Sequence, residues 1–165
     1  NNQIYGLTKG QSSPTTEIGV LTSSTPYGKP EEAIDPFALY MTLGVSFIAS
    51  GFSSQVKELA KLIGEGMRHP GFAIIHVQSP CTTYNDTYEA LKGNKAKGIE
   101  GAAWDIDENH DASNRMSAME IINRGGIPLG VVYRDESRPA FHERNEELHT
   151  QAKSKTHCRC QNTPF

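Results

Sequence analysis

The first fifteen residues, NNQIYGLTKGQSSPT, contain side chains that can bind a metal ion and an anion. Amide oxygens such as that of Asn2 and backbone carbonyls are hard donors, which Mg²⁺ prefers. Lys9 supplies a mobile positive charge for a carboxylate or phosphate, and Gly6 and Gly10 let the backbone approach a ligand closely. On residue types alone, a polar turn with an exposed lysine is the more common explanation. The position of this segment in the fold has to decide between a binding loop and such a turn.

Three cysteines, Cys81, Cys158 and Cys160, are the other reactive groups. Their odd number and their spacing do not fit the disulfide framework of a small secreted domain. A lone cysteine such as Cys81 is more often an inert buried residue than a ligand, and a [4Fe–4S] cluster generally needs four thiolates. The pair Cys158 and Cys160, beside His157, could begin a zinc or cluster site. No second pair completes it, so we expect two free thiols in a tail.

The composition argues against several classes of partner. With 16 Lys and Arg against 19 Asp and Glu, the 165-residue chain has a formal net charge of −3 and no dense basic block. A nucleic-acid partner is therefore not expected. Apolar stretches such as 44–49 and 72–77 are far shorter than the roughly 20 residues that span a membrane. The composition predicts a soluble, cytoplasmic protein with no membrane partner.

The elements that must position these groups begin with one strand–helix–strand unit. Asp35-Pro36 is a cap followed by a proline suited to a first helical turn, and Gly44 can close the helix 37–43. A buried strand is predicted over 45–50. Apolar positions at helical spacing predict a helix over 54–68, capped by Ser53 or Ser54, and a second buried strand follows at 72–77.

The rest of the chain is less regular. We expect a long loop over 11–32, irregular structure with one short helix near Tyr88 over 82–111, a helix capped by Ser113 that ends at Gly125-Gly126, a strand over 127–133 and a surface helix over 139–153. The alternation of helix and buried strand predicts an α/β fold with a parallel sheet that helices cover on both faces. Residues 1–153 form one domain in this interpretation, and 154–165 form a flexible tail.

Three segments resemble a known family. NNQIYGLTKGQSSPT looks like the end of the thiamine diphosphate-binding motif in β subunits of 2-oxoacid:ferredoxin oxidoreductases. SPCTTYN (79–85) is similar to that family's later cysteine segment, and the stretch 111–139 is similar to its last helix, strand and turn. The resemblance implies the thiamine diphosphate-binding fold. It also implies that the chain is the C-terminal part of the subunit, with a GDG segment and two cysteine-bearing stretches expected before Asn1.

The resemblance also implies roles in cofactor binding. The Asn2 side chain and the Ile4 carbonyl would complete the Mg²⁺ sphere that anchors the diphosphate of the cofactor. Leu7 and Thr8 would face the thiazolium ring and the substrate. Cys81 would be the distant fourth ligand of a [4Fe–4S] cluster. Because ligands of such sheets bind at the carboxyl ends of strands, Asn2 and Cys81 must lie at the same edge of the sheet.

Two lysines are candidates for binding the anionic substrates. By the same resemblance, Lys9 would hold an anionic group of the 2-oxoacid or of coenzyme A. Lys57 is a second candidate for the phosphates of coenzyme A, although a solvated lysine on a helix surface is the more common case.

The implied activity is oxidative decarboxylation of a 2-oxoacid to acyl-coenzyme A and CO₂, with electrons passing through the cluster to ferredoxin. The form GLTKGQ favours 2-oxoglutarate, and an α subunit would contribute part of the cofactor pocket. Two alternatives stay open. One is a thiamine diphosphate-dependent decarboxylase or synthase without the redox step. The other is a non-catalytic α/β module in which Asn2 and Lys9 hold an anion or a partner.

Overall fold

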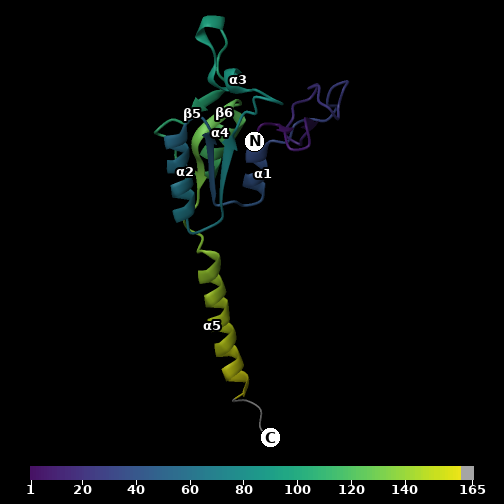
Figure 1. Cartoon of the computed structure of the whole chain (residues 1–165). Helices are drawn as coiled ribbons and strands as arrows, with labels where there is room; N and C mark the ends of the chain where they lie inside the picture. The colour runs from purple at the N-terminus through teal and green to yellow at the C-terminus, as the bar shows by residue number, and fades with distance from the viewer. Residues whose placement is uncertain (161–165) are drawn as a thin grey trace.

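A four-stranded sheet forms the centre of the protein (Figure 1). The computed structural model describes residues 1–160, with side chains through Lys155. The strand order is β4–β3–β6–β5. The strands are β3 (Phe47–Phe52), β4 (Ala73–Gln78), β5 (Ala103–Asp105) and β6 (Ile127–Arg134). The α/β fold and three of these strands were predicted from the sequence, with bounds shifted by one to two residues, whereas β5 was not.

Two of the three strand pairs are parallel, and the central pair is antiparallel. Strand β3 runs parallel to β4, and β5 runs parallel to β6. Strands β3 and β6 are antiparallel, with an irregular register between Ile48 and Ala49. The sheet is therefore mostly parallel rather than uniformly parallel. It consists of two strand–helix–strand units, and the long connection between β4 and β5 leaves the second unit free to point the other way.

Helices cover both faces of the sheet, as predicted. They are α1 (Pro36–Thr42), α2 (Val56–Arg68) and α4 (Arg115–Asn123). The side chains of β3 alternate between the two faces, as in any strand. Phe47 and Ala49 pack with Leu62 of α2, whereas Ile48 packs with Ala118 of α4 and with α1. All six residues of β3 are buried between these two layers.

The ends of α1 confirm the predicted capping. The Asp35 carboxylate accepts hydrogen bonds from the backbone nitrogens of Phe37, at 2.8 Å, and Ala38, at 3.2 Å. Pro36 occupies the first helical turn. Gly44 has φ +71°, the left-handed conformation that ends helices and that glycine adopts without strain.

Two predicted caps were wrong. Asn114, not Ser113, caps α4, and its side-chain oxygen accepts from the nitrogens of the first turn. The Ser113 hydroxyl instead donates to Asp111 Oδ1 at 2.7 Å, so it is not available to the helix. Helix α2 begins after Gln55 without a side-chain cap, rather than at Ser53 or Ser54.

Short elements occur in or just before the two stretches predicted as irregular, 11–32 and 82–111. Strands β1 (Ile4–Tyr5) and β2 (Gln11–Ser12) form a small antiparallel ribbon. The helix expected near Tyr88 is confirmed as α3 (Tyr88–Lys92), and a short 3₁₀ helix, η1 (Lys95–Lys97), follows it. Within the loop, Lys29 is buried and its Nζ donates to the carbonyls of Glu31 and Glu32. These bonds hold a segment that has no regular secondary structure.

Helix α5 (Phe141–Cys160) leaves the sheet at the end opposite α3 (Figure 1). Its described side chains are all exposed, which agrees with the predicted surface helix. The helix continues to Cys160, so the first part of the predicted tail is helical. The side chains of Cys158 and Cys160 and the remaining residues, 161–165, lie outside the described part. Within residues 1–160, no helix has both the length and the apolar character that crossing a bilayer requires.

Candidate functional site

The opening loop is fixed to the carboxyl end of β4. The backbone nitrogen of Asn1 donates to the Val77 carbonyl at 2.5 Å, and the Ser79 nitrogen donates to the Asn1 carbonyl at 2.8 Å. The Asn85 side-chain nitrogen donates to the Asn2 carbonyl at 2.7 Å. The loop therefore has a defined position at the strand end where α/β sheets bind ligands.

Cys81 lies at the same edge as Asn2. Cys81 and Asn85 form an isolated antiparallel bridge, with backbone hydrogen bonds of 3.1 and 2.9 Å. Because the Asn85 side chain bonds to Asn2, this one residue joins the cysteine loop to the opening loop. The Cys81 sulfur is 4.0 Å from the position that a Cβ on Gly6 would occupy. The shared edge that the enzyme hypothesis requires is therefore observed.

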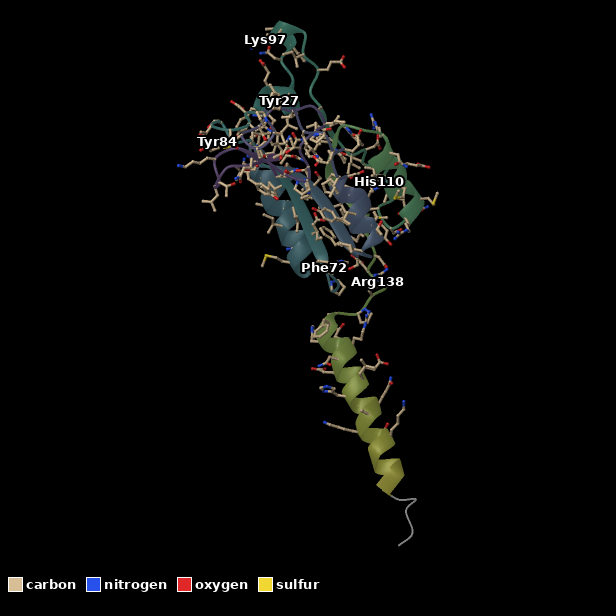
Figure 2. All side chains as sticks on the ribbon, turned by 90° about the vertical axis from the view of Figure 1, so that its right-hand side faces the viewer. Tyr27, Phe72, Tyr84, Lys97, His110 and Arg138 are labelled. Carbon is tan, nitrogen blue, oxygen red and sulfur yellow. The ribbon has the colours of Figure 1, made fainter. Side chains whose placement is uncertain are left out.

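A tight turn at residues 6–9 packs against Tyr84. The Lys9 nitrogen donates to the Gly6 carbonyl at 3.0 Å, which closes the turn. Lys9 and Gly10 have positive φ angles of +69° and +95°. A Cβ on Gly6 would lie 3.6 Å from the Tyr84 ring, and one on Gly10 would lie 3.2 Å from it. The glycines thus let the backbone approach the aromatic ring, which is labelled at the upper left of the molecule in Figure 2.

The tip of this turn is open to solvent. Leu7 is 98 % exposed, and Thr8 and Lys9 are also exposed. A fully exposed leucine gains nothing from the fold itself, since its apolar surface remains in water. These three predicted site residues are thus free to contact a ligand or another subunit.

Lys57 lies apart from the opening loop. It is exposed in the first turn of α2, which packs on the face of the sheet opposite α1. Strands β3 and β4 end at the same edge, where the Ser53 nitrogen donates to the Gln78 carbonyl at 2.9 Å. Lys57 therefore comes shortly after the edge where β3 and β4 end, but the described contacts do not join it to Asn2 or Lys9.

The surroundings of Cys81 favour its thiolate form. The backbone N–H groups of Tyr84 and Thr83 point at the sulfur and lower the pKa of the Cys81 thiol. A thiolate is the form that binds iron. Among the side chains described, no three His, Cys, Asp or Glu residues gather as a metal site would need. Cys81 therefore fits a cluster as a single ligand whose partners come from other segments.

The opening loop offers oxygen donors without charge. Residues 1–16 contain no aspartate or glutamate, so the loop can offer a metal only neutral ligands such as the Asn2 amide and the Ile4 carbonyl. Mg²⁺ is usually bound by one or two carboxylates together with substrate phosphates. The loop therefore fits a magnesium diphosphate as a partial site, in which a carboxylate from elsewhere and the diphosphate balance the metal charge.

The sequence reasoning missed Asn85 and Tyr84 as contributors to the site. Both lie within SPCTTYN, which drew attention for its cysteine and its resemblance. The available signal was the spacing, because a residue four positions after Cys81 can turn back and pair with it. The polar residue His76, which interrupts the apolar strand FAIIHV, was a similar signal.

Comparison with known families divides the chain into two matched regions. Residues 1–77 match the family described as thiamine pyrophosphate enzyme, C-terminal TPP binding domain. Residues 81–150 match the family described as the C terminal of the pyruvate ferredoxin oxidoreductase beta subunit. The first match ends near the end of β4 and the second begins at Cys81, so the two loops of the site come from different matched regions.

Similar proteins carry related names. The chain is 36 % identical to the 2-oxoacid:ferredoxin oxidoreductase subunit beta of Saccharolobus solfataricus, over 89 % of this chain and 50 % of that protein. It is 38 % identical to the 2-oxoglutarate synthase subunit KorB of Archaeoglobus fulgidus, over 51 % of this chain and 32 % of the relative. The chain spans about half the length of the 2-oxoacid:ferredoxin oxidoreductase β subunits that it matches.

A solved structure has the same fold. It is the 2-oxoglutarate:ferredoxin oxidoreductase from Magnetococcus marinus with 2-oxoglutarate, coenzyme A and succinyl-CoA bound. The TM-score is 0.81 at 31 % sequence identity, and the match covers 99 % of this chain and 56 % of the other. Nearly all of the described architecture therefore occurs in that protein.

Proposed function

This chain belongs to the family of 2-oxoacid:ferredoxin oxidoreductase β subunits, and we propose that it provides one side of a thiamine diphosphate site in such an enzyme. The reaction would convert a 2-oxoacid, coenzyme A and oxidised ferredoxin to acyl-coenzyme A, CO₂ and reduced ferredoxin. The observation that carries the proposal is the joining of the Asn2 loop to the Cys81 loop through Asn85. This places oxygen donors and a thiolate at one edge of the sheet.

The opening loop would bind the metal and the anions. The Asn2 side chain and the Ile4 carbonyl would hold Mg²⁺, and the metal would anchor the diphosphate of the cofactor. Bound thiamine diphosphate supplies the carbon nucleophile that decarboxylation of a 2-oxoacid requires. Lys9, exposed beside Leu7 and Thr8 at the tip of the turn, would neutralise a carboxylate of the 2-oxoacid or a phosphate of coenzyme A.

Cys81 would hold one iron of a [4Fe–4S] cluster. The backbone N–H groups of Tyr84 and Thr83 lower the pKa of its thiol, which favours the thiolate form that binds iron. The bridge to Asn85 would keep the cluster beside the cofactor, so that electrons would have only a short distance to cross from the cofactor to the cluster. A reduced thiolate ligand also suits the cytoplasm, where thiols are kept reduced.

The substrate and the partners are further parts of the proposal. We favour 2-oxoglutarate, since relatives named 2-oxoglutarate synthase and a structure containing 2-oxoglutarate and coenzyme A resemble this chain. An α subunit is expected to cover the exposed turn at Leu7, because the relatives are named as subunits. Ferredoxin would accept the electrons. Lys57 is proposed only as a secondary contact to coenzyme A phosphates.

The proposal can be tested on the complete subunit encoded by the natural gene, assembled with its α subunit. Thiamine diphosphate should bind only when Mg²⁺ is present, and Asn2→Ala should weaken this binding while leaving the subunits assembled. A non-catalytic anion-binding module would bind inorganic diphosphate equally well without Mg²⁺. That result would reject the proposed function.

A second measurement separates the redox enzyme from a non-redox decarboxylase. The assembled enzyme should show the broad visible absorption of an iron–sulfur cluster, and Cys81→Ser should reduce the iron content and abolish electron transfer to ferredoxin. An active, colourless enzyme would exclude the oxidoreductase and favour the non-redox alternative.

A further inference from the structure

A buried histidine lies directly below the opening loop. His76 of β4 is 8 % exposed and lies on the face that α1 covers. Its Nδ1 is 3.0 Å from the Tyr40 hydroxyl, and the Phe37 ring packs against the imidazole with a centroid distance of 5.1 Å. Helix α1 therefore fixes the orientation of the imidazole ring.

The other ring nitrogen faces the Asn1 side chain. His76 Nε2 is 3.4 Å from Asn1 Nδ2. The amide cannot be turned around, because Asn1 Oδ1 already accepts from the Gln3 nitrogen and from the Thr15 hydroxyl, each at 3.0 Å. An amide nitrogen can only donate, so Nε2 accepts and the ring proton lies on Nδ1, which donates to Tyr40. Burial, the main cause, lowers the pKa of His76 to about 4, which keeps the ring neutral as this arrangement requires.

The Asn1 amide in turn holds a strained residue. Gln3 has φ +66°, a conformation that residues with a side chain adopt at a cost of roughly 1–2 kcal/mol. The bond from its nitrogen to Asn1 Oδ1 stabilises this conformation. Its carbonyl accepts from the hydroxyls of Ser13 and Thr16. Gln3 stands between the two residues proposed to bind Mg²⁺, so its conformation sets their relative directions.

We propose that His76 is a positioning residue: it orients the Asn1 amide, which holds Gln3 in its left-handed conformation between the two proposed magnesium ligands. Tyr40 acts one step earlier, since its hydroxyl fixes the imidazole ring. None of these groups needs to touch the metal or the cofactor. The inference rests on the proposed function, because the geometry it controls is that of the magnesium loop.

The test compares two histidine variants of the complete subunit assembled with its α subunit. His76→Leu removes the acceptor nitrogen and replaces the imidazole with an apolar side chain of similar length. His69→Leu is the matched control, because His69 Nε2 is 2.9 Å from the Ser46 hydroxyl at the opposite end of the same strands. We expect His76→Leu to raise the Mg²⁺ concentration needed for thiamine diphosphate binding about tenfold, as loss of outer contacts to metal ligands does. The control should leave it unchanged.

A readout without cofactor separates this inference from the proposed function. Hydrogen exchange of the Gln3 amide, measured in the absence of cofactor, should become faster in His76→Leu and not in His69→Leu. If the unsubstituted enzyme binds no thiamine diphosphate, the proposed function fails, and the exchange rates still test the positioning. Equal exchange rates, or equal Mg²⁺ requirements, in the two variants would overturn the inference.

A milder variant covers the case in which His76→Leu does not fold. Tyr40→Phe removes only the hydroxyl that orients the imidazole and keeps the aromatic packing against Phe37. It should shift the Mg²⁺ requirement in the same direction by a smaller factor. No shift in this variant, together with unchanged exchange at Gln3, would refute the role of the hydrogen-bonded chain.

Discussion

Substitution of Asn85 should loosen the cofactor loop more than it destabilises the fold. Asn85→Ala removes the 2.7 Å bond to the Asn2 carbonyl but keeps both backbone bonds to Cys81. A hydrogen bond of this kind contributes about 0.5–1.5 kcal/mol, and the half-buried Asn2 carbonyl can bind water in the variant. We expect the unfolding midpoint to fall by about 2–4 °C and thiamine diphosphate affinity, measured with saturating Mg²⁺, to fall about three- to tenfold.

The aspartate variant sharpens this prediction. Asn85→Asp keeps the shape of the side chain, but its carboxylate cannot donate and faces the carbonyl oxygen of Asn2. Its negative charge also stands on the residue whose backbone pairs with Cys81. Cofactor affinity should therefore decrease from the unsubstituted protein to Asn85→Ala to Asn85→Asp. Asn94→Ala is a matched control, since it removes an amide donor bonded to Glu89 at 2.6 Å, outside the site. Equal affinities for the alanine and aspartate variants would refute the reasoning.

Three further predictions test other parts of the structure. Gly10→Ala and Gly19→Ala both place alanine at positive φ, at a cost of about 1–2 kcal/mol. Urea denaturation should show a larger loss of unfolding free energy for Gly10→Ala, because its Cβ meets an aromatic ring at 3.2 Å, whereas that of Gly19→Ala meets nothing within 4 Å. Lys9→Met should raise the KM for coenzyme A or the 2-oxoacid with little change in cofactor affinity, and an equal effect of Lys57→Met would contradict the assignment. Because burial lowers the pKa of His76 from 6.5 to about 4, the unfolded chain binds the extra proton between these values. The contribution of His76 to the free energy of unfolding should thus fall by about 3 kcal/mol as the pH drops from 6.5 to 4. A pH dependence of the free energy of unfolding that is unchanged in His76→Leu would disprove this.

The sequence predicted the elements whose signal is local. The helix over 54–68 and the strands on either side of it follow from apolar spacing, and the Asp35 cap places the start of α1. The residues of the site came from the family resemblance, and the rule that loops at the ends of parallel strands meet predicted that they share one edge. Asn2 and Cys81 therefore lie together as expected.

The features that were missed depend on contacts between distant segments. The residues of a strand do not encode its direction, so the antiparallel pairing of β3 and β6 has no local signal. Strand β5 has three residues, too few for a pattern. Ser113 and Asn114 are both good caps, and only the competing carboxylate of Asp111 decides between them. The roles of Asn85 and His76 can be inferred only when it is known that the opening loop contacts them.

The antiparallel pairing of β3 and β6 also places α5 and the loops of Asn2 and Cys81 at opposite ends of the sheet. Strand β6 finishes at the edge where β3 begins, so α5 departs from the pole remote from the Asn2 and Cys81 loops (Figure 1). An affinity tag, a fluorescent reporter or a surface linkage attached along α5 would lie away from the edge at which the Asn2 and Cys81 loops meet. Tethering through α5 is therefore expected to leave this edge free for the ligands and subunit proposed above.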